Sequence, residues 1–159
     1  HQSGRRQRQM CIRDRPSTIT RLQNMGTPDY LISAACQLVV AQRLARRNCK
    51  DCKVPDDDVN PKVLQDLGFT AEVASRVKAI KGKGCPKCKD TGYKGRQGIY
   101  EILTVSKPLK EAILRKATTP ELREIAVKEG FQTMQDMGRR LIASGDLNFR
   151  EYERVLSGE

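Results

Sequence analysis

Four of the six cysteines of this 159-residue chain form two C-x-x-C pairs, Cys49 with Cys52 and Cys85 with Cys88. A C-x-x-C turn brings two thiolates to one side of the backbone. Each pair is therefore half of a cage for one tetrahedral metal ion, with Zn–S distances of about 2.3 Å. A closed set of four thiolates is typical of structural zinc, because catalytic zinc keeps a coordination position open for water. The spacing predicts a structural Zn²⁺ site.

Three other interpretations of the four cysteines are open. Disulfides need an oxidising compartment, but the chain shows no apolar signal segment and is long enough to build a core without covalent cross-links. A rubredoxin-like iron site fits the same sulfurs, although no other feature suggests electron transfer. A redox C-x-x-C explains only one pair. Zinc is preferred because it uses all four side chains and needs neither an oxidising compartment nor a redox partner.

Lysines surround both cysteine pairs. Four thiolates on one Zn²⁺ leave a net charge of −2, which nearby cations offset, and cations also lower thiol pKa values. The lysines are Lys50, Lys53, Lys81, Lys83, Lys87 and Lys89. The positive charge around each C-x-x-C turn, or knuckle, is thus explained without nucleic acid.

Cys36 lies in the apolar run LISAACQLVVAQRL, and we expect it to be a core thiol.

The formal net charge is +11, and 31% of the residues are charged. The chain has no long apolar stretch, so we expect a soluble protein without a transmembrane helix. A basic field suits nucleic acid, an anionic membrane surface or an acidic protein. With no Trp, three Phe and four Tyr, the chain lacks stacking platforms for single strands, which argues against nucleic acid.

Residues able to carry out catalysis are missing. No G-x-x-x-x-G-K-[ST] loop is present to bind nucleotide phosphates. The only histidine is His1, which excludes a Ser-His-Asp or Cys-His site within this chain. We therefore expect no catalytic and no cofactor-binding residues here, and a fragment that is inactive by itself.

The pattern of caps and apolar residues predicts a mainly helical fold with a small β-hairpin. A helix is expected over residues 27–47, with Thr27 as N-cap and Pro28 at the first helical position. Short helices follow Asn60 and Thr70. The glycines of residues 89–105 indicate a β-hairpin whose strand is GIYEILTV.

The last third of the chain repeats helix start signals. Ser106, Thr133 and Asn148 each precede an apolar periodic segment, and Thr118 with Glu121 forms a capping-box pattern. Glycines 130, 145 and 158 end three of these helices. Apolar residues of the last two helices are expected to form one core face. They are Met134, Met137, Leu141, Phe149, Tyr152 and Leu156.

Several motifs together resemble one family. They are PSTITRLQNMG at residues 16–26, QRLARRNCKDC at 42–52 and GKGCPKCKDTGYKGRQGIYEIL at 82–103, followed by GFQTMQDMGRRLI. Over residues 16–159 the chain resembles the carboxyl-terminal part of type II secretion and type IV pilus assembly ATPases of the tetracysteine zinc-binding type. The resemblance implies the C-terminal part of a RecA-like, P-loop hexameric motor.

The resemblance also implies a domain organisation. Residues 16–26 would end the ATPase core, and residues 27–159 would form a C-terminal domain. Within it we expect a zinc-binding subdomain over residues 48–103 and a helical bundle over residues 106–157. The nucleotide site of such a motor, with its ATP and Mg²⁺, lies upstream of this chain.

The resemblance implies a cytoplasmic homohexamer that powers pilus assembly or protein secretion. It would work at the inner face of the inner membrane, beneath an inner-membrane platform protein.

Four arginines are candidate contacts to a neighbouring subunit or to the platform protein. They are Arg43, Arg46, Arg47 and Arg96. A solvated basic face is an equal alternative for each. The alternative function is a zinc-ribbon nucleic-acid-binding module, which predicts strongly salt-dependent binding.

Residues 1–15 depart from the family pattern. Cys11 stands where the family's histidine box has its histidine, and Arg13 and Arg15 depart as well. One back-translation of residues 9–15 resembles a transposon end used in sequencing libraries. We therefore expect residues 1–15 to be non-native.

Overall fold

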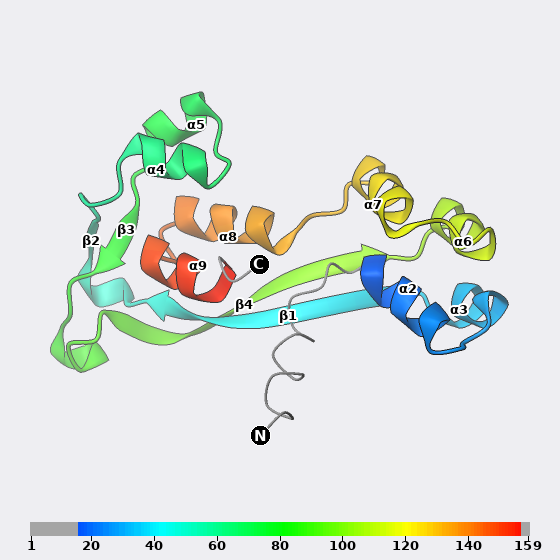
Figure 1. The fold of residues 1–159 in the computed structure, drawn as a ribbon. Coiled ribbons are helices and arrows are strands. Elements are labelled where there is room, and N and C mark those ends of the chain that lie inside the picture. Colours follow the sequence, from blue (N-terminus) through cyan, green and yellow to red (C-terminus); the bar gives the residue numbers. More distant parts are fainter. Residues whose placement is uncertain (1–15, 157–159) are drawn as a thin grey trace, which may run out of the picture. The chain divides into compact units, whose positions relative to one another are not determined.

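The computed structural model describes residues 16–156 (Figure 1). The N-terminal segment expected to be non-native and the helix stop expected at Gly158 lie outside these residues. The helices are α2 (Pro16–Asn24), α3 (Asp29–Ala35), α4 (Pro61–Asp66), α5 (Ala71–Arg76), α6 (Lys107–Leu114), α7 (Thr119–Lys128), α8 (Met134–Ala143) and α9 (Phe149–Leu156). The strands are β1 (Leu38–Asn48), β2 (Lys53–Pro55), β3 (Ile80–Gly82) and β4 (Tyr93–Thr104), and the 3₁₀ turns are η1 (Lys50–Cys52) and η2 (Pro86–Cys88).

The described chain divides into two compact units. One contains residues 16–41 and 100–133, and the other contains residues 42–99 and 134–156. The expected zinc-binding subdomain of residues 48–103 lies mainly in the second unit. The expected helical bundle of residues 106–157 is divided, because α6 and α7 belong to the first unit and α8 and α9 to the second. Among the described helices, none is long and apolar enough to cross a bilayer.

The first unit has a continuous apolar core. Helices α2, α3, α6 and α7 pack together there, and burial of large aliphatic side chains supplies the main driving force. The largest fully buried members are Ile19, Leu103, Leu109, Ile113 and Leu122. Cys36 is a half-buried free thiol that packs against this core, as expected for a small apolar side chain.

The second unit combines the cysteine pairs with α4, α5, α8 and α9. Helix α8 passes close to α9 at Gly138, where an added Cβ would lie 2.5 Å from Leu156 Cδ1 and 2.6 Å from Tyr152 Cε2. Three residues of the predicted core face are buried: Met134, Tyr152 and Leu156. The other three are half-buried: Met137, Leu141 and Phe149.

The helix expected over residues 27–47 is wrong beyond Ala35. The chain leaves the helix at Cys36, which has φ −79° and ψ 114°, and continues as strand β1. The apolar spacing of residues 31–44 fits a helix, but Val39 and Val40 are β-branched and favour a strand once a partner strand is available. Burial along β1 alternates accordingly, with Ala45 buried and Leu44 exposed.

The expected local β-hairpin over residues 89–105 is also wrong, although the strand is right. Residues 93–104 form one continuous strand whose partner is β1, and β2 pairs with β3 in a second two-stranded sheet. Cys49 N donates to Gly92 O at 2.9 Å, and at the other end Val105 N donates to Gln37 O at 2.9 Å. These two bonds make β1 and β4 antiparallel, as Figure 1 shows. A small sheet is thus confirmed, but it closes over a long sequence separation.

Most of the predicted helix starts are confirmed, but the predicted Thr27 cap is wrong, because α3 begins at Asp29 after Pro28 and has no side-chain capping bond. At four of the predicted caps, the side-chain oxygen accepts a hydrogen bond from the backbone N–H three residues later. These caps are Asn60, Thr70, Ser106 and Asn148. At α7 the Glu121 carboxylate accepts from Thr118 N at 2.7 Å, which completes the expected capping box. These local bonds satisfy backbone donors that a helix leaves unpaired.

Candidate metal centre

The structure brings the four paired cysteines into one cluster. All four Sγ atoms lie within 4.8 Å of one another. Cys49 Sγ lies 3.9 Å from Cys85 Sγ, Cys52 Sγ lies 3.9 Å from Cys88 Sγ, and the Cys85 and Cys88 sulfurs are 3.6 Å apart. A tetrahedron with metal–sulfur bonds of about 2.3 Å has edges of about 3.8 Å. The observed distances therefore suit one tetrahedral cation.

These distances also exclude disulfides in the structure. Bonded sulfurs lie about 2.0 Å apart, and all four thiols are free. Cys49 and Cys88 are buried, whereas Cys52 and Cys85 are half-buried. The cluster is thus a largely enclosed set of four soft donors that could hold a metal.

Backbone geometry explains how the knuckles form. Each C-x-x-C pair lies on a 3₁₀ turn, η1 or η2, and the second turn ends in left-handed residues at Lys89 (φ 53°) and Asp90 (φ 58°). Backbone amides donate to sulfur, from Gly84 N to Cys52 Sγ at 3.4 Å and from Cys85 N to Cys88 Sγ at 3.2 Å. N–H···S bonds of this kind orient thiolates.

The short β2–β3 sheet aligns the two knuckles. Lys53 pairs with Gly82 and Pro55 with Ile80, so the strand leaving the first cysteine pair runs beside the strand entering the second. Gly82 meets Gly92 so closely that an added Cβ on Gly82 would lie 2.0 Å from Gly92 O. Only glycine fits this contact, which ties the β3 end to the start of β4.

Burial and hydrogen bonds shift the pKa values of three thiols in the cluster. Burial raises the pKa of Cys52 to about 12 and raises that of Cys85. Burial acts in the same direction at Cys88, but hydrogen bonds from the Cys85 and Gly92 backbone outweigh it and lower that pKa to about 7. A divalent cation bound by the four sulfurs would favour the thiolate form of each.

The turn between α8 and α9 contacts the residues on either side of the first C-x-x-C pair. The carboxylate of Asp146 accepts from Arg47 Nη2 at 3.1 Å and from Lys53 Nζ at 3.1 Å. Asn48 is fully buried and donates from Nδ2 to Ile80 O at 2.9 Å and to Gly145 O at 3.1 Å. These contacts fix the end of β1, from which the first knuckle continues.

Three of the four candidate interface arginines make contacts within the chain. Arg46 and Arg47 bind Glu151 and Asp146, and Arg43 Nη1 donates to a backbone carbonyl of α9. Within the described part of the chain, Arg96 is exposed and makes no hydrogen bond or ion pair. Arg96 is therefore the member of this set most available to another molecule.

Sequence reasoning missed the role of Glu151. Its backbone N donates to Asn148 Oδ1 at 2.8 Å, as the predicted cap requires, but its carboxylate does not turn back to the cap. Instead the fully buried carboxylate binds Arg46 and Arg154, and the Arg46 guanidinium lies 4.1 Å from the centre of the Tyr93 ring. A buried carboxylate at this position has no local sequence signal, because Arg46 is 105 residues away.

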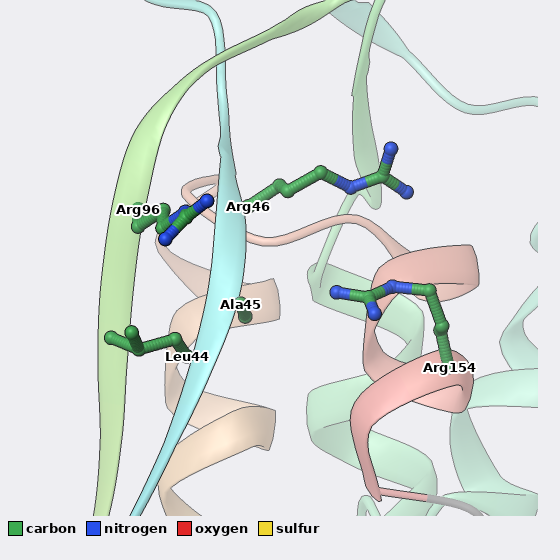
Figure 2. Close-up of a pocket in the computed structure, with 5 residues that line it drawn as sticks. All are labelled: Leu44, Ala45, Arg46, Arg96 and Arg154. Atoms are coloured by element: carbon green, nitrogen blue, oxygen red, sulfur yellow. The ribbon is translucent and has the colours of Figure 1, made fainter.

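A shallow basic cavity of about 460 Å³ lies beside this network. Figure 2 shows Arg46 reaching from β1, Arg154 from α9 and Arg96 from β4 around Leu44 and Ala45. The Glu151 carboxylate neutralises part of the charge of Arg46 and Arg154. Arg96 contributes a further positive charge to the cavity wall.

The fold and the site define a class: a protein module of short helices and two small sheets, closed by a four-cysteine cluster that could hold a metal. The sequence model of the type II/IV secretion system protein family matches residues 12–154. The chain therefore belongs to that family, and its resemblance to secretion and pilus assembly ATPases is confirmed. The match includes residues 12–15 of the segment expected to be non-native.

Curated relatives agree with this assignment. The chain is 36% identical over 138 residues to the type IV pilus assembly ATPase PilB of Myxococcus xanthus, a match that covers 87% of this chain and 24% of PilB. PilB of Thermus thermophilus is 39% identical over 125 residues, or 79% of this chain and 14% of that protein.

A secretion protein is similarly related. The type II secretion system ATPase E of Vibrio cholerae is 35% identical over 136 residues, which cover 76% of this chain and 26% of that protein. The chain spans about a quarter or less of the length of the two PilB relatives. Most of each relative therefore has no counterpart in this chain.

Proposed function

We propose that this chain is the C-terminal part of a cytoplasmic hexameric ATPase that powers type IV pilus assembly or type II secretion. The observation that carries the proposal is the four-cysteine cluster within a chain that matches the family over most of its length. ATP and Mg²⁺ would bind upstream, and this part would serve a structural and coupling role. The boundaries at residues 16–26 and 27–159 belong to the same proposal.

The β1–β4 sheet supports its origin in a larger, RecA-like core. Among residues 16–156, no third strand pairs with either of these strands, although both are long and free edges are normally covered. In the first unit, apolar side chains on one face are about half exposed: Leu38 52%, Val40 51%, Tyr100 41% and Ile102 50%. An open, apolar sheet face of this kind suits burial against the upstream motor segment.

For the metal we propose Zn²⁺, bound by Cys49, Cys52, Cys85 and Cys88. A closed set of four sulfurs at tetrahedral distances leaves no position for substrate or water. Zinc would supply a rigid cross-link between two segments separated by residues 53–84. Stiffness of this kind would let the module transmit motion from the motor without distorting.

For the partners we propose a neighbouring subunit and an inner-membrane platform protein, which would place the motor at the inner face of the inner membrane. Arg43, Arg46, Arg47 and Arg96 are the proposed contact residues. Arg96 is the strongest of them because its charge is not used within the described part of the chain. Exposed arginines can form bidentate ion pairs with carboxylates of a partner.

The test joins this chain to its upstream motor segment and compares wild type with Cys85→Ser. We expect the wild type to hydrolyse ATP, to bind one equivalent of zinc and to support pilus assembly or secretion. Cys85→Ser should bind nucleotide but lose zinc and output. A Cys85→Ser motor with normal output would refute the coupling role. Steeply salt-dependent binding to nucleic acid would instead favour the zinc-ribbon alternative.

A further inference from the structure

An ion pair joins the two cysteine knuckles outside the sulfur cluster. Asp51 lies inside the first C-x-x-C turn and Lys87 inside the second, and Lys87 Nζ lies 2.8 Å from Asp51 Oδ1. The two residues are 36 positions apart. The contact therefore bridges the same two halves of the cage that a metal would bridge.

The pair also lies next to a donor sulfur. Asp51 Oδ2 is 3.8 Å from Cys49 Sγ, so the second carboxylate oxygen faces the cluster while the first is held by Lys87. Aspartate and lysine side chains are both charged at neutral pH, so this contact is an ion pair.

Charge balance gives the pair a function. Four thiolates and a divalent cation carry a net charge of −2, and an unshielded Asp51 carboxylate would add repulsion beside Cys49. Lys87 neutralises that carboxylate through the 2.8 Å contact. Partners of this kind, one contact beyond the ligands, typically change metal affinity by about 10–100-fold.

We propose that Lys87 and Asp51 form an ion-pair latch that holds the two C-x-x-C halves together around a divalent metal and slows its release. The inference rests on the proposed metal site. The latch does not ligate the metal. It positions the two turns. It also neutralises the Asp51 carboxylate, which lies 3.8 Å from Cys49 Sγ.

A matched control lies in the first knuckle. Lys50 stands between Cys49 and Cys52, as Lys87 stands between Cys85 and Cys88. Lys50 is exposed and has no hydrogen bond or ion pair within the described residues. Replacing Lys50 removes the same charge from the corresponding position of the other C-x-x-C turn but leaves the contact between Lys87 and Asp51 intact.

The experiment measures zinc release from the zinc-loaded 159-residue chain into an excess of a colour-forming chelator. We expect Lys87→Ala to release zinc about ten-fold faster than wild type, and Lys50→Ala to stay within about two-fold. Lys87→Arg should restore slow release. The Lys87→Ala effect should shrink in about 1 M salt, where the Debye length is about 3 Å.

A double mutant tests the pairing itself. Asp51→Asn combined with Lys87→Ala should release zinc no faster than Lys87→Ala alone, because both changes break one contact. Additive effects, or equal rates for Lys87→Ala and Lys50→Ala, would overturn the latch. If Lys87→Ala does not fold, Asp51→Asn is compared with Asp90→Asn, and equal rates again overturn it. A wild-type chain that takes up no zinc would defeat the metal proposal itself.

Discussion

Arg46 donates three hydrogen bonds to the buried carboxylate of Glu151, from its backbone N at 2.7 Å, its Nε at 2.9 Å and its Nη2 at 2.7 Å. Arg154 binds the same carboxylate from α9 itself. Glu151 is fully buried, so these bonds replace the water that its charge has lost. The contact joins α9 to the end of β1 that precedes Cys49.

Glu151→Gln should destabilise the protein by about 2–3 kcal/mol, because hydrogen bonds to charged groups each contribute about 1.5–3 kcal/mol and two arginines lose their partner. The cost stays below that of a fully buried pair since the Arg46 and Arg154 side chains are 49% and 54% exposed and regain water. Urea unfolding measures the change. Glu153→Gln, at an exposed site on the same helix, should change stability by less than about 0.5 kcal/mol.

The same carboxylate should make stability depend on acid pH. Burial alone would raise the pKa of Glu151, but hydrogen bonds from Arg154 and Arg46 outweigh it and lower the pKa from 4.5 to about 2. A depressed pKa in the folded state gives stability that is complete above about pH 4.5 and is lost as the pH falls toward 2. The shift corresponds to roughly 3 kcal/mol.

The difference in urea midpoint between wild type and Glu151→Gln isolates this effect, because both proteins contain the same four-cysteine cluster. We expect the difference to be constant from pH 7 to about pH 5 and to shrink steadily below it. A difference that persists unchanged at pH 3 would contradict the lowered pKa.

Gly92→Ala should disrupt the metal centre. Gly92 has φ +74°, and an added Cβ would lie 2.4 Å from Gly82 O. Its carbonyl also accepts from Cys49 N at 2.9 Å. Left-handed strain of about 1–2 kcal/mol therefore adds to a backbone clash, and we expect a total loss of about 3 kcal/mol or more together with reduced zinc per chain. Thermal unfolding and elemental analysis measure the two.

Gly95→Ala is the matched control for this change. Gly95 has a similar φ of +81°, but nothing lies within 4 Å of its added Cβ. The Gly95→Ala variant should be less stable by only the left-handed strain of about 1 kcal/mol, and it should bind as much zinc as wild type. Equal damage from both substitutions would show that the approach of Gly82 and Gly92 is unimportant.

Removal of the metal should loosen the second unit first. The β2–β3 sheet has three residues in each strand and connects directly to both knuckles, so it is too short to persist without them. Hydrogen exchange after chelation should accelerate at residues 53–55 and 80–82. Residues 109–126 of the first unit should keep their protection, because their apolar core does not include the cluster. Uniform acceleration would contradict this separation.

Local signals in the sequence predicted the features whose causes are local. The C-x-x-C spacing identified all four members of the sulfur cluster, because two residues between cysteines fix where a turn points its sulfurs. The caps at Asn60, Ser106 and Thr118 were also correct, since a cap needs only a side chain and the amide three residues on.

Tertiary structure decided the rest. Residues 38–48 have a helical apolar spacing, yet they form β1 because β4 offers backbone partners more than forty residues away. Glu151 likewise gained its role only when folding brought Arg46 to it across 105 positions. The sequence by itself determined the two C-x-x-C turns and most of the helix starts, because these depend on contacts between near neighbours. Strand pairing and the buried ion pair depend on hydrogen bonds and burial between distant segments, which no short stretch of sequence encodes.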